Sequence, residues 1–285
     1  MTSRRAKGTS FGFIATTGDT RGAESPAWSH DSSTIVYAST NAGKDGRLDG
    51  QVGAPFTGVS DLYTVPYNGG AGGAATPLQG AAESAWDEFY PSFSPDDAFV
   101  AFDRVPNADG IRYYAPKAEV YVVPSKGGTA TRLAANDPPA CMKQINTNMA
   151  AASPGVTNSW PRWSPEYPTC DGKTYYWLIF SSSRLGIPFG NQVNPTNLAA
   201  IFKNGGPTYT NEPTSQLYLT SVVTSGSTVQ TSPAIYIWNQ PISSTTYPGA
   251  AAGGSAQSNH TPSWEVVEIA PPVPVPPPPP PPPPR

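Results

Sequence analysis

One short motif recurs along the chain and limits what the sequence can fold into. The motif is Pro-x-(Trp/Phe)-Ser, followed by a turn and an alternating apolar strand. Its copies lie in residues 24–37, 90–102, 160–180 and 260–264, the third with a short insertion. Their aromatic anchors are spaced 65, 70 and 101 residues apart and are Trp28, Phe93, Trp163 and Trp264. Self-similarity at such periods indicates a protein built from stacked structural repeats.

A second strand pattern follows each of the first three motifs. Residues 61–66, 119–124 and 216–220 each contain Leu-Tyr or Val-Tyr, and the first two are followed by Gly-Gly and a further short strand. Period-2 alternation of β-branched and aromatic residues, bounded by Gly, Pro, Asn and Asp, predicts strand–turn–strand throughout. Helical periodicity with caps is absent over any twelve residues. The sequence therefore predicts an all-β fold with four short antiparallel strands per module.

Repeated four-stranded modules with an aromatic anchor are typical of β-propeller blades. One blade cannot bury both faces of its sheet, so neighbouring blades stack and each anchor fills the gap between them. The modules exceed the ~40–50 residues of a minimal blade. We expect the excess in long loops on one face, where propellers carry function: residues 41–60, 106–117, 138–158 and 186–214.

The repeat resembles the TolB-type β-propeller repeat, also called the WD40-like propeller repeat. The shared pattern is Pro-x-Trp-Ser-(Pro/His)-Asp, a strand, then (Leu/Val)-Tyr-x-Val and Gly-Gly. Residues 179–186, Ile-Phe-Ser-Ser-Ser-Arg-Leu-Gly, resemble the end of a strand in the same repeat. The resemblance covers about residues 23–269 and implies a propeller in the periplasm or a secreted protein. It is specific for the fold and not for an activity.

The chain divides into three parts on this reading. Residues 1–22 form an N-terminal segment, within which residues 11–17 are expected to supply a closing strand. Residues 23–269 hold modules that begin near residues 24, 88, 158 and 259, three complete and a fourth partial or composite. A degenerate blade at residues 233–238 is the alternative. Residues 270–285 contain nine consecutive prolines and predict a polyproline II spacer or a disordered tail.

Ring closure is the physical difficulty for three and a half modules, because propellers need roughly four to eight blades. An incomplete ring exposes apolar blade faces, which favours self-association. The chain is alternatively a fragment of a longer propeller protein without independent activity. No export signal is found, because the apolar run after the basic residues 1–7 is too short, so a cytoplasmic location and a start further upstream stay open.

Composition excludes several partners. Charged residues make up 13% of the chain, against ~25% in a typical soluble domain, and the net charge is −3. Nucleic-acid binding needs clustered Lys and Arg, so we expect no nucleic-acid partner. No apolar run approaches the ~20 residues of a membrane helix, so we expect no membrane insertion.

Metal and disulfide candidates are few. Cys141 and Cys170 are compatible with one disulfide or with two unrelated thiols. Asn41, Asp45 and Asp49 lie among glycines and are weak calcium candidates, since calcium prefers oxygen ligands. The EF-hand pattern fails at its twelfth position, so a Gly-Asp turn is the preferred interpretation. No other cofactor is indicated.

The catalytic set of a serine hydrolase is not found. The chain has no Gly-x-Ser-x-Gly elbow, and His30 occupies a motif turn in which sister modules carry Pro. We assign no catalytic residue and favour a noncatalytic scaffold for protein or glycan ligands over an enzyme. A saccharide lyase or hydrolase that uses the central funnel is the alternative. The expected ligand face carries Arg104, Tyr113, Tyr114, Arg184, Phe189 and Tyr209.

Overall fold

The computed structural model describes residues 12–41, 59–107, 118–137, 158–182, 216–237 and 262–264. These residues form β-strands and two short 3-10 turns, η2 (Asn68–Gly70) and η4 (Ala134–Asn136). Within the described residues no helix is long and apolar enough to cross a membrane. The prediction of an all-β protein built from antiparallel modules is confirmed for the described residues, whose modules form two sheets of four strands and one of six.

The first sheet is an antiparallel meander in the order β2-β3-β4-β6. Its strands are β2 (Gly22–Trp28), β3 (Thr34–Thr40), β4 (Ser60–Pro66) and β6 (Thr76–Pro77). The second sheet repeats this meander with β7 (Trp86–Phe93), β8 (Phe99–Pro106), β9 (Glu119–Pro124) and β10 (Thr131–Arg132). Each sheet begins with the motif strand, as the repeat predicts.

The third sheet is larger and has six strands. Its main path is β11 (Ser159–Trp163), β13 (Lys173–Ser182), β14 (Gln216–Ser225) and β15 (Thr228–Thr231). Two short strands extend it, β12 (Thr169–Cys170) on β13 and β16 (Ile235–Tyr236) on β14. The hypothesis of a degenerate blade at residues 233–238 is therefore wrong, because β16 completes the third sheet.

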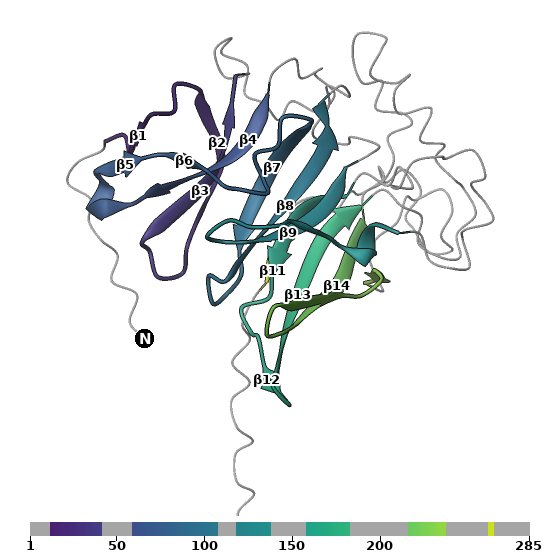
Figure 1. Cartoon of the computed structure of the whole chain (residues 1–285). Helices are drawn as coiled ribbons and strands as arrows, with labels where there is room; N and C mark the ends of the chain where they lie inside the picture. The colour runs from purple at the N-terminus through teal and green to yellow at the C-terminus, as the bar shows by residue number, and fades with distance from the viewer. Residues whose placement is uncertain are drawn as a thin grey trace, which may run out of the picture.

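The three sheets stack face to face (Figure 1). The first strand of each module crosses the preceding sheet, so that β7 packs against β2, β3 and β4, and β11 packs against β7, β8 and β9. Two apolar cores result. The first joins sheets one and two through residues that include Val36, Leu62, Phe89 and Phe102, and the second joins sheets two and three through residues that include Val122, Trp163, Leu178 and Phe180.

A kink recurs at one position in every motif strand. Ser25, Tyr90 and Trp160 each precede the motif proline and have φ of 48°, 52° and 56°. At the same place the ladder between the first and second strands slips its register in all three sheets. Positive φ is uncommon outside glycine, and its recurrence identifies a β-bulge that belongs to the module.

The aromatic anchors differ in their surroundings. Phe93 and Trp163 are buried, whereas Trp28 and Trp264 are 45% and 37% exposed. Trp163 donates its indole N–H to the carbonyl of Ser92 at 3.0 Å, and Trp264 donates to the carbonyl of Arg162 at 3.1 Å. The last contact places residues 262–264 beside the third sheet.

The N-terminal segment lies on the outside of the first sheet. Strand β1 (Ala15–Thr17) pairs in parallel with β5 (Gly72–Ala74). Ile14 packs against a cluster formed by the buried Ile35, Tyr37 and Val65. Residues 14–17 thus cover the free face of the first sheet, and among the described residues the strand partner of β1 is β5.

Candidate functional site

Strand register defines one end of each sheet, which we call the loop end. There the second strand of each module ends and the third begins, at the pairs Thr40 and Ser60, Arg104 and Glu119, and Ser182 and Gln216. The long loops expected from the sequence at these positions fall mostly on residues 42–58, 108–117 and 183–215, which lie outside the described residues. Strands β8 and β13 run in the same direction toward this end (Figure 1).

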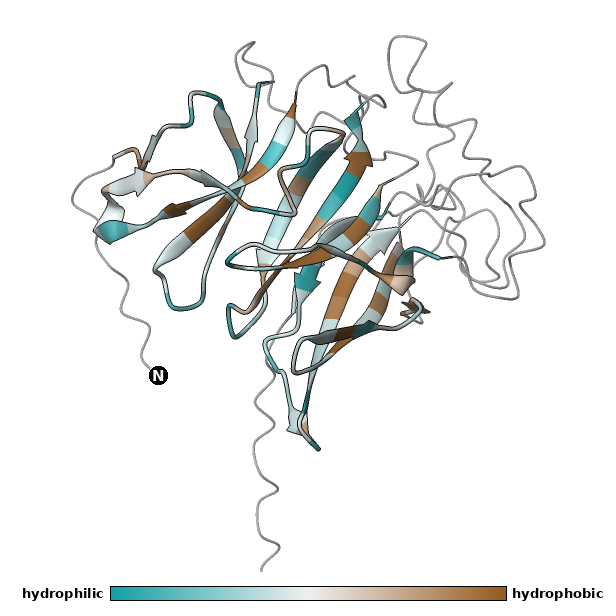
Figure 2. Cartoon of the chain, in the orientation of Figure 1, coloured by the Kyte–Doolittle hydropathy of each residue, from teal (hydrophilic) through white to brown (hydrophobic). Residues whose placement is uncertain are grey.

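Polar side chains are buried at the loop end. Figure 2 shows hydrophilic and hydrophobic residues alternating along β8 as it approaches this end. Because a buried polar group must find a partner or lose free energy, such a concentration is unusual for a purely structural core. The buried polar residues of this end are Ser39, Thr40, Ser60, Asp87, Glu88, Asp103, Arg104, Glu119, Asn136, Asn158, Ser159, Ser181 and Ser182.

A row of alternating charges crosses the loop end of the second sheet. We call Glu88, Arg104, Glu119, Arg132 and Asp137 the charge row. Glu88 pairs with Arg104 and Arg104 pairs with Glu119 in the strand register, so their side chains share one face. Arg132 donates to both carboxylate oxygens of Glu119, at 2.8 and 2.9 Å, and to Asp137 at 3.0 Å.

Arg104 occupies the middle of the charge row and is 8% exposed. Its Nη2 donates to the carbonyl of Gly80 at 2.6 Å and lies 3.0 Å from Oε1 of Glu88. The guanidinium carbon lies 4.7 Å from the ring centre of Tyr121 and 5.7 Å from that of Trp86, within cation–π range. Arg104 is therefore held in one orientation, which suits a group that recognises a ligand.

Glu88 is fully buried beside Arg104. Burial raises the pKa of its carboxyl to about 8, and the nearby guanidinium offsets only part of that effect. Its Oε2 has no hydrogen-bond partner among the described residues. Next to it, Asp87 accepts a hydrogen bond from the backbone N–H of Ser60 at 3.0 Å. These carboxyls join the first two sheets and are sealed from solvent.

The outer half of the charge row is more open. The side chain of Arg132 is 27% exposed, and its pKa is raised, against the effect of burial, by the carboxylates of Glu119 and Asp137. Tyr121 donates its hydroxyl to Glu119 at 3.2 Å, and burial raises its pKa to about 12. Arg132 therefore stays positively charged near neutral pH.

A second buried acid faces the third sheet. Asp103 accepts a hydrogen bond from the backbone N–H of Trp160 at 3.0 Å, and complete burial raises its pKa well above the usual range. Arg162 is the nearby cation, and burial lowers its pKa. The ring of Trp160 stacks on Tyr90 with centres 4.0 Å apart. Asp103 and this stack fasten the third module to the second.

A groove of about 520 Å³ lies against Arg104. It runs between the connector that enters β7 and the β9–β10 turn, and its wall combines a tryptophan ring with hydrogen-bonding groups. Its lining includes Gln79, Glu83, Ser84, Trp86, Arg104 and Thr129. A planar ring among polar groups suits a ligand with both apolar and hydroxylated faces.

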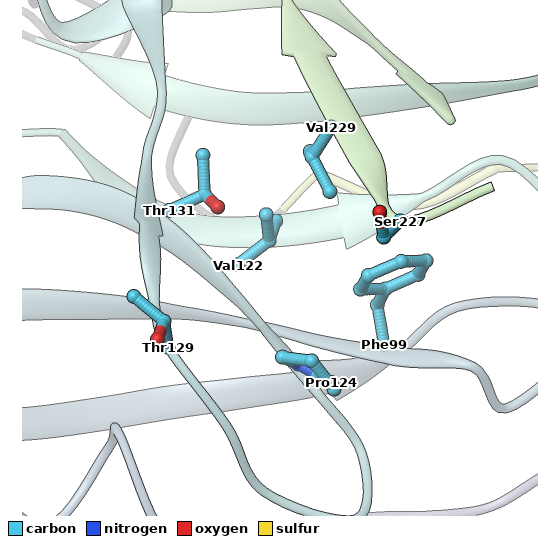
Figure 3. Close-up of a pocket in the computed structure, with 7 residues that line it drawn as sticks. All are labelled: Phe99, Val122, Pro124, Thr129, Thr131, Ser227 and Val229. Atoms are coloured by element: carbon cyan, nitrogen blue, oxygen red, sulfur yellow. The ribbon is translucent and has the colours of Figure 1, made fainter. Parts of the chain in front are cut away.

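A smaller groove of about 310 Å³ lies between the second and third sheets (Figure 3). Phe99, Pro124 and Val229 contribute its apolar wall, and hydroxyl side chains complete it. None of the described residues that line it has a titratable side chain. The larger groove is therefore the better candidate for specific recognition.

The expected ligand face is only partly described. Arg104 lies at the loop end as expected, whereas Tyr113, Tyr114, Arg184, Phe189 and Tyr209 lie outside the described residues. Sequence reasoning did not select Trp86, Glu119 or Arg132, although charged residues inside otherwise apolar strands were a usable signal.

The metal and disulfide candidates remain predictions. Asn41 is exposed at the end of β3, and Asp45 and Asp49 lie outside the described residues. No cluster of His, Cys, Asp or Glu that could hold a metal ion occurs in the part of the chain that the structure describes. Cys170 is an exposed free cysteine in β12, and Cys141 lies outside the described part.

His30 lies far from the charge row in sequence and belongs to a turn. Its Nδ1 lies 2.9 Å from Asp97, which also accepts the backbone N–H groups of His30 and Asp31. Asp96 accepts from Ser94 and from the hydroxyl of Tyr176. These turn carboxylates bind neighbouring modules together.

No family model matches the chain, and no curated protein matches it. Among solved structures the chain is similar to one described as a TolB from Agrobacterium tumefaciens, with 15% sequence identity and a TM-score of 0.33. The match covers 75% of this chain and 50% of that chain, so this chain spans about half the length of that protein. That protein is a TolB-like β-propeller, and the repeat in this sequence resembles the repeat of that family.

Proposed function

We propose that the chain is a noncatalytic β-propeller-type scaffold that binds a glycan or protein ligand at its loop end, outside the cytoplasm. The observation that carries the proposal is the fixed position of Arg104, held by Gly80 and Glu88 on the wall of a groove that also contains Trp86. A binding site gains affinity when its groups are already in place before the ligand arrives.

A saccharide suits the larger groove best. Sugars present hydroxyl groups around an apolar ring face, and the groove offers the Trp86 ring beside Gln79, Glu83 and Ser84. Arg104 adds a cation that is suited to an acidic sugar. Because the rest of the chain carries few charges, the positive charge of Arg104 can attract a ligand carboxylate to this groove.

A saccharide hydrolase or lyase is the second candidate. Glu88 favours it, because a carboxyl with a pKa of about 8 is protonated near neutral pH, as a general acid must be. The full burial of Glu88 weighs against it, since a catalytic acid must reach the substrate. Binding without turnover is therefore our conclusion.

The test uses polygalacturonate as an acidic polysaccharide and dextran as a neutral one, with titration calorimetry of the full chain. We expect wild type to bind polygalacturonate and W86A to bind it at least tenfold more weakly, a loss of about 1.4 kcal/mol. The matched control is S227A, which changes an exposed residue of the smaller groove.

Three results would decide against the proposal. If the wild-type chain binds neither polysaccharide, a glycan is not the ligand. If W86A and wild type bind polygalacturonate with equal affinity, the larger groove is not the binding site. Release of reducing ends or of unsaturated sugars during incubation identifies an enzyme in place of a scaffold.

A further inference from the structure

The third sheet has one face against the second sheet and one face turned away from it. Tyr176, Leu178 and Phe180 pack into the core shared with the second sheet. Because side chains alternate along a strand, Trp177 and Ile179 lie on the opposite face. We call this opposite face the outer face of the third sheet.

The outer face is apolar and partly exposed. Ile179 pairs with Leu219, and Leu219 pairs with Ile235, so all three side chains share that face. Trp177 is 38% exposed and Ile235 is 60% exposed. Exposed apolar surface of this kind marks a docking surface.

Trp264 identifies what docks there. Trp163 donates its indole N–H to the carbonyl of Ser92, the residue before the anchor Phe93. Trp264 donates its indole N–H to the carbonyl of Arg162, the residue before the anchor Trp163. Each tryptophan thus contacts the equivalent carbonyl of the preceding module, at 3.0 and 3.1 Å.

The burial of the motif proline also indicates that residues 262–264 are docked. Pro91 lies in β7 and Pro161 lies in β11. Each of these strands packs on the preceding sheet, and both prolines are buried. Pro262 is buried as well, whereas Pro26 of the first module is exposed. Residues 262–264 (the short yellow segment beside β11 in Figure 1) therefore have the surroundings of a docked motif strand.

We propose that the outer face of the third sheet is a strand-docking surface whose occupant is this chain's own segment ending at Trp264. Residues 257–264 align with β7 in sequence, and the described end of this segment, residues 262–264, contacts β11 through the Trp264 indole. The segment is the first strand of a fourth module, held in place by the Trp264 indole. This inference rests on blade packing and is independent of the proposed ligand.

The test is hydrogen exchange of indole N–H groups in the full chain, labelled with ¹⁵N at tryptophan. The seven signals are assigned with single Trp→Phe variants, including W264F, W163F and W28F. We expect the Trp264 indole to exchange at least tenfold more slowly than that of Trp28. We also expect W264F, which keeps a ring and loses the donor, to lower the unfolding midpoint.

A substitution on the docking surface supplies the second arm. W177E places a carboxylate on the outer face without touching the core shared with the second sheet, and we expect it to speed exchange at Trp264 and not at Trp163. S227E is the matched control, because it adds the same charge to the exposed β14–β15 turn.

Two outcomes would overturn the proposal. Exchange at Trp264 as fast as at Trp28, and unchanged by W177E, means that nothing docks. Protection that grows with protein concentration means that a second copy supplies the strand.

Discussion

The guanidinium of Arg104 lies 3.0 Å from the carboxyl of Glu88, and both side chains are almost completely buried. Breaking a buried pair of this kind leaves one group without a partner and costs several kcal/mol. A hydrophobic pair of equal volume stabilises a core as well or better, so the polar pair is poor evidence for stability alone. We interpret it as the rigid base of the groove.

The first prediction concerns pH. Glu88 has a pKa of about 8 when folded and an ordinary value near 4.5 when unfolded, so unfolding releases its proton between these values. The free energy of unfolding should therefore fall as pH rises from 4.5 to 8, by roughly 3–5 kcal/mol. Asp103, whose folded pKa is also raised, acts in the same direction. Urea unfolding at several pH values measures the slope.

Replacing Glu88 isolates its contribution to that slope. E88Q resembles the protonated acid, so we expect a flatter dependence on pH than in wild type. S227A, which changes a non-titrating residue at an exposed turn, should leave the slope unchanged. A wild-type stability that rises between pH 5 and 8 would contradict the assignment.

The second prediction concerns Asp103, which accepts the N–H of Trp160. D103A leaves that buried donor without its partner and should lower the free energy of unfolding by about 1–3 kcal/mol. D103N keeps an acceptor oxygen of similar shape and should cost less. Equal losses for the two variants would mean that the hydrogen bond contributes nothing. Denaturant midpoints of both variants give the answer.

The third prediction concerns the core between the first two sheets. Phe102 is 0% exposed, so F102A creates a cavity and should cost about 3–5 kcal/mol. Phe13 is fully exposed, and F13A should change stability by less than about 0.5 kcal/mol. Thermal and urea unfolding of the pair compare the two sites. Similar losses at both positions would be inconsistent with the stacked core.

The fourth prediction concerns Gly80, whose carbonyl accepts from Arg104. Gly80 has φ +86°, and a Cβ there would collide with the carbonyl of Gly128. We expect G80A to destabilise the chain and to weaken ligand binding, because the connector that lines the groove must move. Gly172 has φ +70° and open space around it, so G172A should cost only about 1 kcal/mol of backbone strain. Stability of G80A equal to that of G172A would argue against the close approach.

Local pattern made the modules predictable from the sequence. The bulge before each motif proline, the turn at Ser94–Asp97 and the alternation in β8 all depend on neighbours in the chain. In that turn the N–H of Asp97 donates to the carbonyl of Ser94, as Pro-Asp spacing predicts. Because the motif recurs along the chain, the same local pattern predicted each of the three sheets.

The charge row was not predictable in the same way. Glu88, Arg104 and Glu119 are 15 or more residues apart, and only the register of three strands brings them into line. Glu88 lies within β7 but before the motif copy at residues 90–102, so the motif did not fix its register. A shift of one residue in that register would have placed Glu88 on the opposite face.

The parallel pairing of β1 with β5 was also unexpected. The sequence led us to expect a closing strand of the ring in residues 11–17, and nothing in it indicated pairing with β5. Gly72 permits the close approach, since a Cβ there would collide with the backbone of Ala15. Such a contact depends on tertiary structure and produces no periodic pattern in the sequence.

The covering of the first sheet by Ile14 and β1 has a consequence for how the molecule comes apart. In a linear array each unit is stabilised mainly by its neighbours, so terminal units open first. The first sheet is protected on both sides, by the second sheet and by β1, and Ile35 and Tyr37 are 4% and 2% exposed. Fraying should therefore start at the other end of the array, at the docked strand that ends at Trp264, and travel inward through the third sheet, which gives the unfolding of this chain a direction.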